Sequence, residues 1–274
     1  MEDKIKCEGF KQKVNGLEFY CELRGSGPTI GLIPGGVGDC GSFEKVAEML
    51  AGEFTVFTYD MRYCSRSERP AKMSPITPGI LADDTAALIK TLDLAPISFY
   101  GSSSGGQCVL SLGVYYPELC RNLLVHEAAL MSDTPPGSGV AFLKAQVETM
   151  VQMTGSKDTL FKVMGPVMSG DPQAWEALGP EFHERIGKNG QVWIDLMLEQ
   201  VSSRVYTDKE LANLPPTVFS VGLTQAGWLV YATIKTAQRA KAELVWLPGT
   251  HYPQVSHPDA LTQHIRQNTL KYVR

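Results

Sequence analysis

A serine within a glycine-rich turn is the residue of this 274-residue chain best suited to do chemistry. Ser103 is the central residue of a Gly-x-Ser-x-Gly pattern that runs from Gly101 to Gly105. An apolar stretch, residues 94–100, precedes the pattern, and a helix-like stretch, residues 107–116, follows it. A strand-turn-helix of this kind leaves the serine hydroxyl exposed, because the turn is so tight that small residues must flank it. The pattern therefore predicts a nucleophilic serine; without its flanks it would indicate only a serine- and glycine-rich loop.

A serine hydroxyl needs a neighbouring base, and the chain offers five histidines. His251 follows an apolar stretch, residues 244–247, and a Pro-Gly turn. This order predicts a loop beyond the carboxyl end of the last strand, the edge at which open α/β sheets build their sites. His251 is the predicted base. We expect His257 to begin the final helix and His264 to lie on its surface or pack within it.

The acid that orients the histidine is expected at an unusual place. In most proteins of this architecture it follows the seventh strand, here residues 217–223, but the sequence contains no carboxylate between Glu210 and Glu243. One strand earlier, Glu127 ends an apolar run and could approach the same imidazole, so we predict it as the acid. Asp133 is the alternative, and a helix-capping role for Glu127 stays open. His126 should face the opposite way and contribute to packing.

Two backbone N–H groups must bind the negative charge of the tetrahedral intermediate. Ser104, directly after the nucleophile, should supply one of them. The glycine-rich loop of residues 34–39, after the predicted third strand, should supply the other, from Gly36 or, as the near alternative, Val37. A phosphate cradle is excluded for this loop because the chain lacks the lysine and the helix motif that such a cradle needs. The predicted chemistry requires no metal and no organic cofactor.

Composition narrows the class of protein. At 274 residues the chain is long enough for one α/β domain with an insertion. Hydrophobic residues make up 43% and charged residues 20% of it, which is typical of a globular protein. A net charge of −4 argues against nucleic acid and anionic membranes as partners. The first four residues lack a targeting pattern, and no apolar run is long enough to span a membrane. Six scattered cysteines predict neither zinc nor disulfides, and hence a reduced, cytoplasmic protein. A homodimer is left open.

The remaining periodicity predicts strands at residues 9–14, 17–24, 29–33 and 55–59, and helices at 41–51 and 80–92. Asp83 and Asp84 are expected on a solvated helix face. Residues 132–213 interrupt the pattern and should form a helical cap domain, with residues 1–131 and 214–274 as the core domain. We expect most large cap side chains to form the cap's own core rather than to contact substrate: Met150, Met153, Met164, Met168, Trp175, Phe182, Trp193 and Met197.

Several segments resemble the zearalenone hydrolases, which are lactonases of the α/β-hydrolase fold. Residues 247–259 resemble that family's histidine segment, residues 174–179 and parts of 183–193 resemble its cap, and residues 125–127 resemble the segment of its catalytic glutamate. The similarity spans nearly the full length. It implies an α/β-hydrolase fold: a mostly parallel eight-stranded sheet flanked by helices, with a helical cap inserted between strands six and seven.

The resemblance also implies a substrate, the ester of a resorcylic acid macrolactone such as zearalenone, with Trp193 hydrogen-bonding it from the cap. Three departures from the family alter the expected pocket walls: Gly35 replaces an aspartate, Arg62 and Tyr63 replace Pro-Gly, and the region around Trp228 differs. The partner is expected to be a small apolar ester or lactone. The predicted substrate-binding residues are Gly35, Val37, Ser102, Met164, Trp193, Trp228 and Tyr252.

Other functions stay open from the sequence. A general carboxylesterase or a hydrolase of carbon–carbon bonds would use the same three residues. A ligand receptor on this fold would keep them but turn over little, and multiple-turnover kinetics would distinguish it. Dehalogenases and epoxide hydrolases are disfavoured, because they use an aspartate where Ser103 stands.

Overall fold

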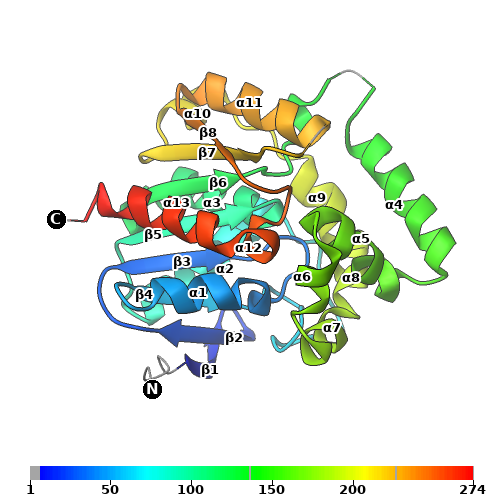
Figure 1. Ribbon diagram of the computed structural model, residues 1–274, viewed down its shortest axis with the longest axis horizontal. Coiled ribbons are helices and arrows are strands. Elements are labelled where there is room, and N and C mark those ends of the chain that lie inside the picture. Colours follow the sequence, from blue (N-terminus) through cyan, green and yellow to red (C-terminus); the bar gives the residue numbers. More distant parts are fainter. Residues whose placement is uncertain (1–6, 136, 226, 274) are drawn as a thin grey trace.

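A twisted eight-stranded sheet lies in the middle of the molecule, with helices on both of its faces (Figure 1). The computed structural model describes residues 7–273 except residues 136 and 226, so the predictions for the first residues lie outside it. The strands span Cys7–Val14 (β1), Leu17–Arg24 (β2), Thr29–Ile33 (β3), Thr55–Tyr59 (β4), Ile97–Ser102 (β5), Cys120–His126 (β6), Thr217–Gly222 (β7) and Glu243–Leu247 (β8).

The strand order is β1-β2-β4-β3-β5-β6-β7-β8. β1 and β2 form an antiparallel hairpin, β2 runs antiparallel to β4, and all strands from β4 to β8 in that order are parallel. The α-helices span Glu44–Leu50 (α1), Pro78–Thr91 (α2), Ser104–Tyr115 (α3), Val140–Thr154 (α4), Leu160–Ser169 (α5), Pro172–Glu176 (α6), Pro180–Ile186 (α7), Asn189–Val192 (α8), Leu198–Ser202 (α9), Asp208–Ala212 (α10), Trp228–Ala240 (α11), Pro253–Ser256 (α12) and Pro258–Leu270 (α13).

The predicted elements agree with the observed ones to within a few residues, and local chemistry explains the differences. α2 begins at Pro78 because the Thr77 side chain accepts a hydrogen bond from the N–H of Ile80 and so caps the helix. β5 begins at Ile97 and continues to Ser102, directly before the serine turn.

Alternate residues of the central strands bury their side chains on opposite faces of the sheet. On β5, Ile97 and Phe99 pack in the core beneath α2, α3 and α11, whereas Tyr100 packs in a second core beneath α1 and α13. All three side chains are fully buried. Parallel strands that are covered on both faces consist of almost continuous apolar residues, which is why their pattern was clear in the sequence.

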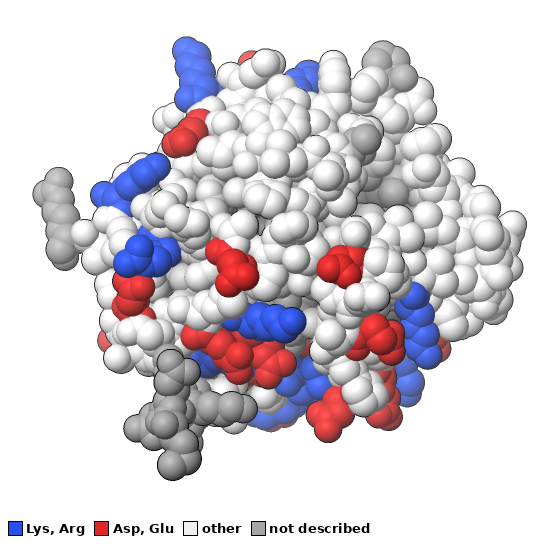
Figure 2. All heavy atoms as spheres, in the orientation of Figure 1, with Lys and Arg blue, Asp and Glu red and all other residues white. Residues whose placement is uncertain are grey.

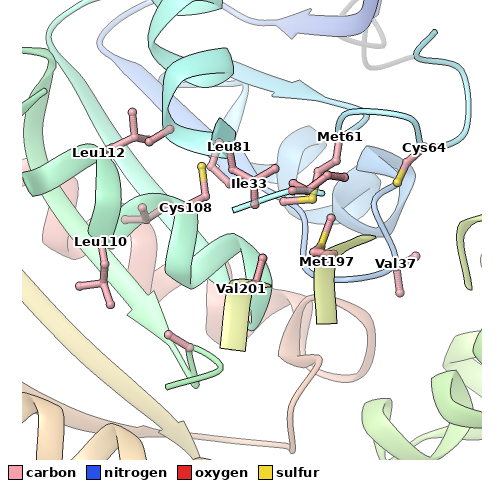
Figure 3. Packing of buried hydrophobic residues seen from close by; sticks show 14 of the residues in the cluster. Ile33, Val37, Met61, Cys64, Leu81, Cys108, Leu110, Leu112, Met197 and Val201 are labelled. Atoms are coloured by element: carbon pink, nitrogen blue, oxygen red, sulfur yellow. The ribbon is translucent and has the colours of Figure 1, made fainter. Parts of the chain in front are cut away.

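The larger core extends from the sheet into the helices between β6 and β7. Leu112 of α3 and Ile33 of β3 belong to the same buried cluster as Met61, Met197 and Val201 (Figure 3). Met197, from the π-helical stretch Trp193–Met197, points toward Met61 in this view. The insertion and the sheet therefore share one continuous hydrophobic core.

Helices α4–α9 gather at the end of the sheet where the parallel strands finish (Figure 1). Of the large side chains expected in their core, Trp175, Phe182, Trp193 and Met197 are buried. Met153 is 83% exposed and is not part of that core. The division into separate core and cap domains stays a prediction. In the part of the chain described, no helix combines the length and apolar character needed to cross a membrane.

Asp84 is buried rather than solvated, which corrects the expectation for the helix of residues 80–92. Arg62 donates two hydrogen bonds to its carboxylate, from Nε to Oδ2 at 2.7 Å and from Nη2 to Oδ1 at 2.5 Å. Asn15 donates a third, at 3.0 Å. Arg62, which we expected to alter the pocket walls, thus forms an ion pair with Asp84. Both partners come from other parts of the chain, so the helix pattern alone could not reveal this ion pair.

Truncating the buried core on α3 should destabilise the fold. Leu110 is fully buried, so Leu110→Ala should lower the free energy of unfolding by roughly 2–5 kcal/mol through lost burial and a residual cavity. Leu270→Ala removes the same atoms from a side chain that is 42% exposed and should cost less than about 1 kcal/mol. Urea denaturation of both variants measures the difference, and equal losses would contradict this account of the core.

Candidate active site

Ser103 lies in the tight turn between β5 and α3. Its backbone adopts φ 56° and ψ −121°, a conformation that costs energy for any residue with a side chain. The N–H of Ser103 donates to the carbonyl of His126 at 3.0 Å. Gly105 permits the close approach of the neighbouring strand, because a Cβ there would lie 2.4 Å from the carbonyl oxygen of Ile33. The surrounding contacts hold Ser103 in its strained conformation, with its side chain only half-buried.

Glu127 follows β6 and connects the ends of two further strands. Its Oε2 accepts a hydrogen bond from Nδ1 of His251 at 2.7 Å, and its Oε1 accepts one from the N–H of Gly222, at the end of β7, at 2.8 Å. Both side chains are buried. Because Nδ1 carries the proton in this hydrogen bond, the lone pair of neutral His251 lies on Nε2. The arrangement can therefore accept a proton at Nε2.

The environment of Glu127 favours its ionised form. Burial alone would raise the pKa of this carboxyl, but the hydrogen bond from His251, the electrostatic influence of the nearby His126 and His251 rings and the N–H of Gly222 lower it. The net result is a pKa below the usual value. Glu127 is thus a carboxylate at neutral pH and can stabilise a protonated His251.

Asp133, the alternative acid, is engaged elsewhere. Its carboxylate accepts hydrogen bonds from Oγ1 of Thr236 at 2.7 Å and from Nη1 of Arg239 at 2.8 Å. Both partners lie on α11. Asp133 therefore ties the segment after β6 to that helix, and the structure brings Glu127 to His251 instead.

His126 holds the loop in which His251 lies. Its Nε2 is 3.2 Å from the carbonyl oxygen of Thr250, and its Nδ1 is 3.0 Å from Oγ of Ser220. A carbonyl can only accept, so Nε2 carries the proton and Nδ1 accepts from the serine hydroxyl. The expectation that His126 faces away from Glu127 was wrong, because its Nε2 lies 4.0 Å from Oε1 of Glu127. His126 is buried, as a packing role requires, and it also holds the residue that precedes His251.

The same loop is held from the opposite side by α5. Oγ1 of Thr250 and the N–H of Tyr252 both donate to the carbonyl of Met168, at 2.7 Å and 3.1 Å. The Tyr252 ring also stacks on the imidazole of His251, with 5.2 Å between ring centroids. Sequence reasoning missed the role of Met168, because a backbone carbonyl leaves no signal in the sequence.

The glycine loop after β3 lies beside the serine turn. A Cβ on Gly35 would lie 3.3 Å from Cβ of Ser103, and one on Gly36 would lie 2.5 Å from Nε1 of Trp193. Ser104 begins α3, where helical N–H groups lack intrahelical acceptors. The structure thus brings Gly35 to the Ser103 turn and Trp193 to Gly36; their roles in binding substrate and oxyanion stay predictions.

The other predicted substrate residues differ in their burial and lie on several elements. Val37 and Ser102 are buried, at the glycine loop and at the end of β5. Met164 is half-buried on α5, and Trp228 is half-buried at the start of α11. Within residues 7–273 as described, no three His, Cys, Asp or Glu side chains are grouped so that they could hold a metal ion.

Comparison of the sequence and the fold with known proteins assigns the chain to a family. Residues 28–161 match the sequence profile of the alpha/beta hydrolase fold. The solved structure of an esterase from Thermogutta terrifontis is similar, with a TM-score of 0.77 and 21% identity, and the match covers 97% of this chain and 99% of that one. The chain is thus an α/β-hydrolase, which confirms the predicted fold class.

Two curated relatives define the family more closely. The chain is 31% identical over 265 residues to the zearalenone hydrolase of Bionectria ochroleuca, covering 94% of this chain and 96% of the relative. It is also 31% identical over 262 residues to the zearalenone hydrolase of Cladophialophora bantiana, covering 94% and 95%. The chain belongs to the zearalenone hydrolase family and is a carboxylic ester hydrolase or lactonase, as the resemblance implied.

The buried His126 should make stability depend on pH. Burial lowers its pKa to about 4, from an ordinary value of 6.5, although the nearby Glu127 opposes this shift. Below pH 6.5 the unfolded chain binds a proton that the folded protein does not, so stability is lost as the pH falls toward 4. At pH 5 the loss from this residue should be roughly 2 kcal/mol.

His126→Gln removes the titration while keeping a polar side chain. The difference in unfolding free energy between pH 7.5 and pH 5, measured by urea denaturation, should be smaller in this variant than in the wild type. His257→Gln, at an exposed histidine, serves as the control and should retain the wild-type difference. An unchanged difference in His126→Gln would show that this histidine does not titrate as described.

Proposed function

We propose that this enzyme opens an apolar macrolactone of the resorcylic acid type, such as zearalenone, through an acyl-enzyme on Ser103. The observation that carries the proposal is the 2.7 Å hydrogen bond between His251 and Glu127, in a chain whose Ser103 lies in a strained turn between strand and helix. The similarity of the chain to two zearalenone hydrolases supports the substrate class.

In the proposed acylation, Oγ of Ser103 attacks the lactone carbonyl while Nε2 of His251 takes the hydroxyl proton. Glu127 holds the imidazole orientation and stabilises the imidazolium. The N–H groups of Gly36 and Ser104 bind the oxyanion. Collapse of the tetrahedral intermediate breaks the bond to the ring oxygen, which receives the proton from His251. The released alcohol stays attached to the acyl group, because the substrate is cyclic.

Deacylation repeats these roles with water as the nucleophile. His251 takes a proton from the water as it attacks the acyl-enzyme, and returns it to Oγ of Ser103 as the ester bond breaks. The sum of both halves is one lactone plus one water giving one hydroxy acid. Every proton is transferred through His251, so the proposed reaction needs no further acid or base.

An apolar groove in the helical insertion supports a large apolar substrate. It has a volume of about 400 Å³ and lies between α4 and α5, where Met150, Met153, Thr154, Val163, Met164, Val167 and Met168 line it. Figure 2 shows few charged side chains over these helices on this face, whereas acidic and basic groups gather lower, over β1, β2 and α7. Met168 also holds the residues on both sides of His251, so the groove adjoins the histidine loop. We propose that the hydrocarbon ring enters here, with Trp193 as its polar contact.

Removing the nucleophile tests the proposed triad. Ser103→Ala should lower kcat/KM for a short-chain aryl ester by at least about a thousandfold, because the triad residues act as a unit. Glu127→Gln should lower it by roughly a hundredfold or more, since the amide cannot stabilise the imidazolium in the same way. Asp133→Asn provides the matched control and should stay within about threefold of the wild type. Retained activity in Ser103→Ala would refute the mechanism.

Substrate class is tested by incubating the wild type and Ser103→Ala with zearalenone and, separately, with the aryl ester. We expect the wild type to open the lactone over many turnovers and the variant to open none of it. Chromatography of the product measures the reaction. Hydrolysis of the aryl ester alone would indicate a general carboxylesterase with altered pocket walls. Binding of zearalenone without turnover would indicate a receptor, and either result would contradict the proposed substrate.

A further inference from the structure

Three side chains at intervals of four residues connect the helical insertion to the glycine loop after β3. Arg185 of α7 contacts Asp39, Asn189 of α8 contacts Val37, and Trp193 covers Gly36. The backbone between α7 and α8 stays right-handed at Gly187 and Lys188, so the three side chains can project on one side. Along the helical segment the contacts run backward along the loop, from Asp39 to Val37 to Gly36.

Asn189 is the centre of this contact, and its amide is fully satisfied. Nδ2 donates to the carbonyl of Val37 and to Oγ of Ser65, each at 2.8 Å. Oδ1 accepts from the N–H of Ser65 at 2.9 Å and from Nη2 of Arg69 at 3.3 Å. The Val37 carbonyl can only accept and the Ser65 N–H can only donate, so the orientation of the amide is unambiguous. The side chain is completely buried.

The hydrogen bond from Asn189 to Val37 is connected through two peptide groups to the N–H of Gly36, the proposed oxyanion donor. The peptide that carries the Val37 carbonyl also carries the N–H of Gly38, which donates to the carbonyl of Gly35 at 2.9 Å. The peptide that carries the Gly35 carbonyl also carries the N–H of Gly36. Each peptide group is planar, so fixing its carbonyl fixes the direction of its N–H. Two hydrogen bonds and two planar peptide groups thus connect Asn189 to the N–H of Gly36.

Arg185 and Trp193 hold the two ends of the same loop. Nε and Nη2 of Arg185 donate to Oδ2 and Oδ1 of Asp39, at 2.9 Å and 3.2 Å. The buried Asp39 carboxylate also accepts from the N–H of Gly41 at 2.8 Å. Trp193 lies so close to Gly36 that no side chain fits between them. The loop is therefore confined along its length by one helical segment.

We propose that Asn189 is a positioning residue for ester hydrolysis: its amide, acting through the Val37–Gly38 and Gly35–Gly36 peptides, aims the Gly36 N–H at the developing oxyanion. This inference rests on the proposed function. Asn189 contacts neither substrate nor Ser103; it acts through the loop. Because it orients a group that binds the transition state, its loss should lower kcat rather than raise KM.

Asn189→Asp is the sharpest test, because aspartate keeps the size and the acceptor oxygen but cannot donate to the Val37 carbonyl. Asn189→Ser, which is shorter and uncharged, is the second variant in case a buried carboxylate prevents folding. Aryl ester hydrolysis is measured per active site, counted with a phosphonate that reacts only with an intact Ser103 centre. A trifluoromethyl ketone, whose serine adduct carries an oxyanion, reports on oxyanion binding.

We expect kcat per site to fall by roughly 10- to 100-fold in both variants, with KM within about threefold of the wild type. The trifluoromethyl ketone should lose affinity by the same factor as kcat/KM. Tyr206→Phe is the matched control, since it removes equally buried hydrogen bonds from the insertion to Ser111 and to the Gln107 carbonyl. It should lower the melting temperature and leave kcat per site unchanged.

Two outcomes would overturn the inference, and they are distinguishable. If the wild type hydrolyses the ester in a Ser103-dependent way but both Asn189 variants keep kcat per site and ketone affinity, the residue is only structural. The same conclusion follows if Tyr206→Phe loses as much kcat as the Asn189 variants do. If no Ser103-dependent hydrolysis is found in the wild type, the proposed function fails, and this inference fails with it.

Discussion

The site depends on one buried carboxylate. Glu127 joins the end of β6 to Gly222 at the end of β7 and to His251 beyond β8, through hydrogen bonds of 2.8 Å and 2.7 Å. A buried carboxylate is costly unless its oxygens are hydrogen-bonded, and here each oxygen has a donor. The same contacts that make the charge tolerable therefore fix the distance between three strand ends and the orientation of the imidazole. Because the carboxylate that binds His251 follows β6, the segment after β7 does not need to contain one.

Backbone strain accompanies this arrangement. Ser103 and Glu127, at the ends of adjacent strands, both have positive φ, 56° and 41°. They are also linked through the backbone, since the N–H of Ser103 donates to the residue before Glu127. Strained conformations persist only where the surroundings over-determine them. Those surroundings are the doubly covered parallel strands and the close contact of Gly105 with β3, so the core of the sheet maintains the geometry of the site.

The sequence was sufficient for features that repeat or that follow a chemical rule. Strand periodicity located the sheet, the glycine pattern located Ser103, and the absence of other carboxylates pointed to Glu127, which the structure places against His251. It was insufficient wherever a side chain finds its partner across the fold. Asp84 was assigned to solvent because Arg62 lies on a loop outside its helix, and the side-chain hydrogen bonds of His126 and Asn189 depend on segments 94 to 152 residues away. Periodicity identifies which face a residue occupies, whereas its partner is set by tertiary packing.

The helical insertion holds both the loop of His251 and the glycine loop after β3, and it does so with different helices. The carbonyl of Met168, on α5, fixes the residues that flank His251, while the amide of Asn189, on α8, fixes the glycine loop. α4 is attached more loosely, since only Leu143 and Val147 of its residues are buried. The apolar groove lies between α4 and α5. Its α5 wall is hydrogen-bonded to the His251 loop, whereas in the part of the chain that the structure describes its α4 wall is not. Changes on the exposed side chains of α4 can therefore alter the shape of the groove while the hydrogen bonds that hold the His251 loop and the glycine loop remain in place.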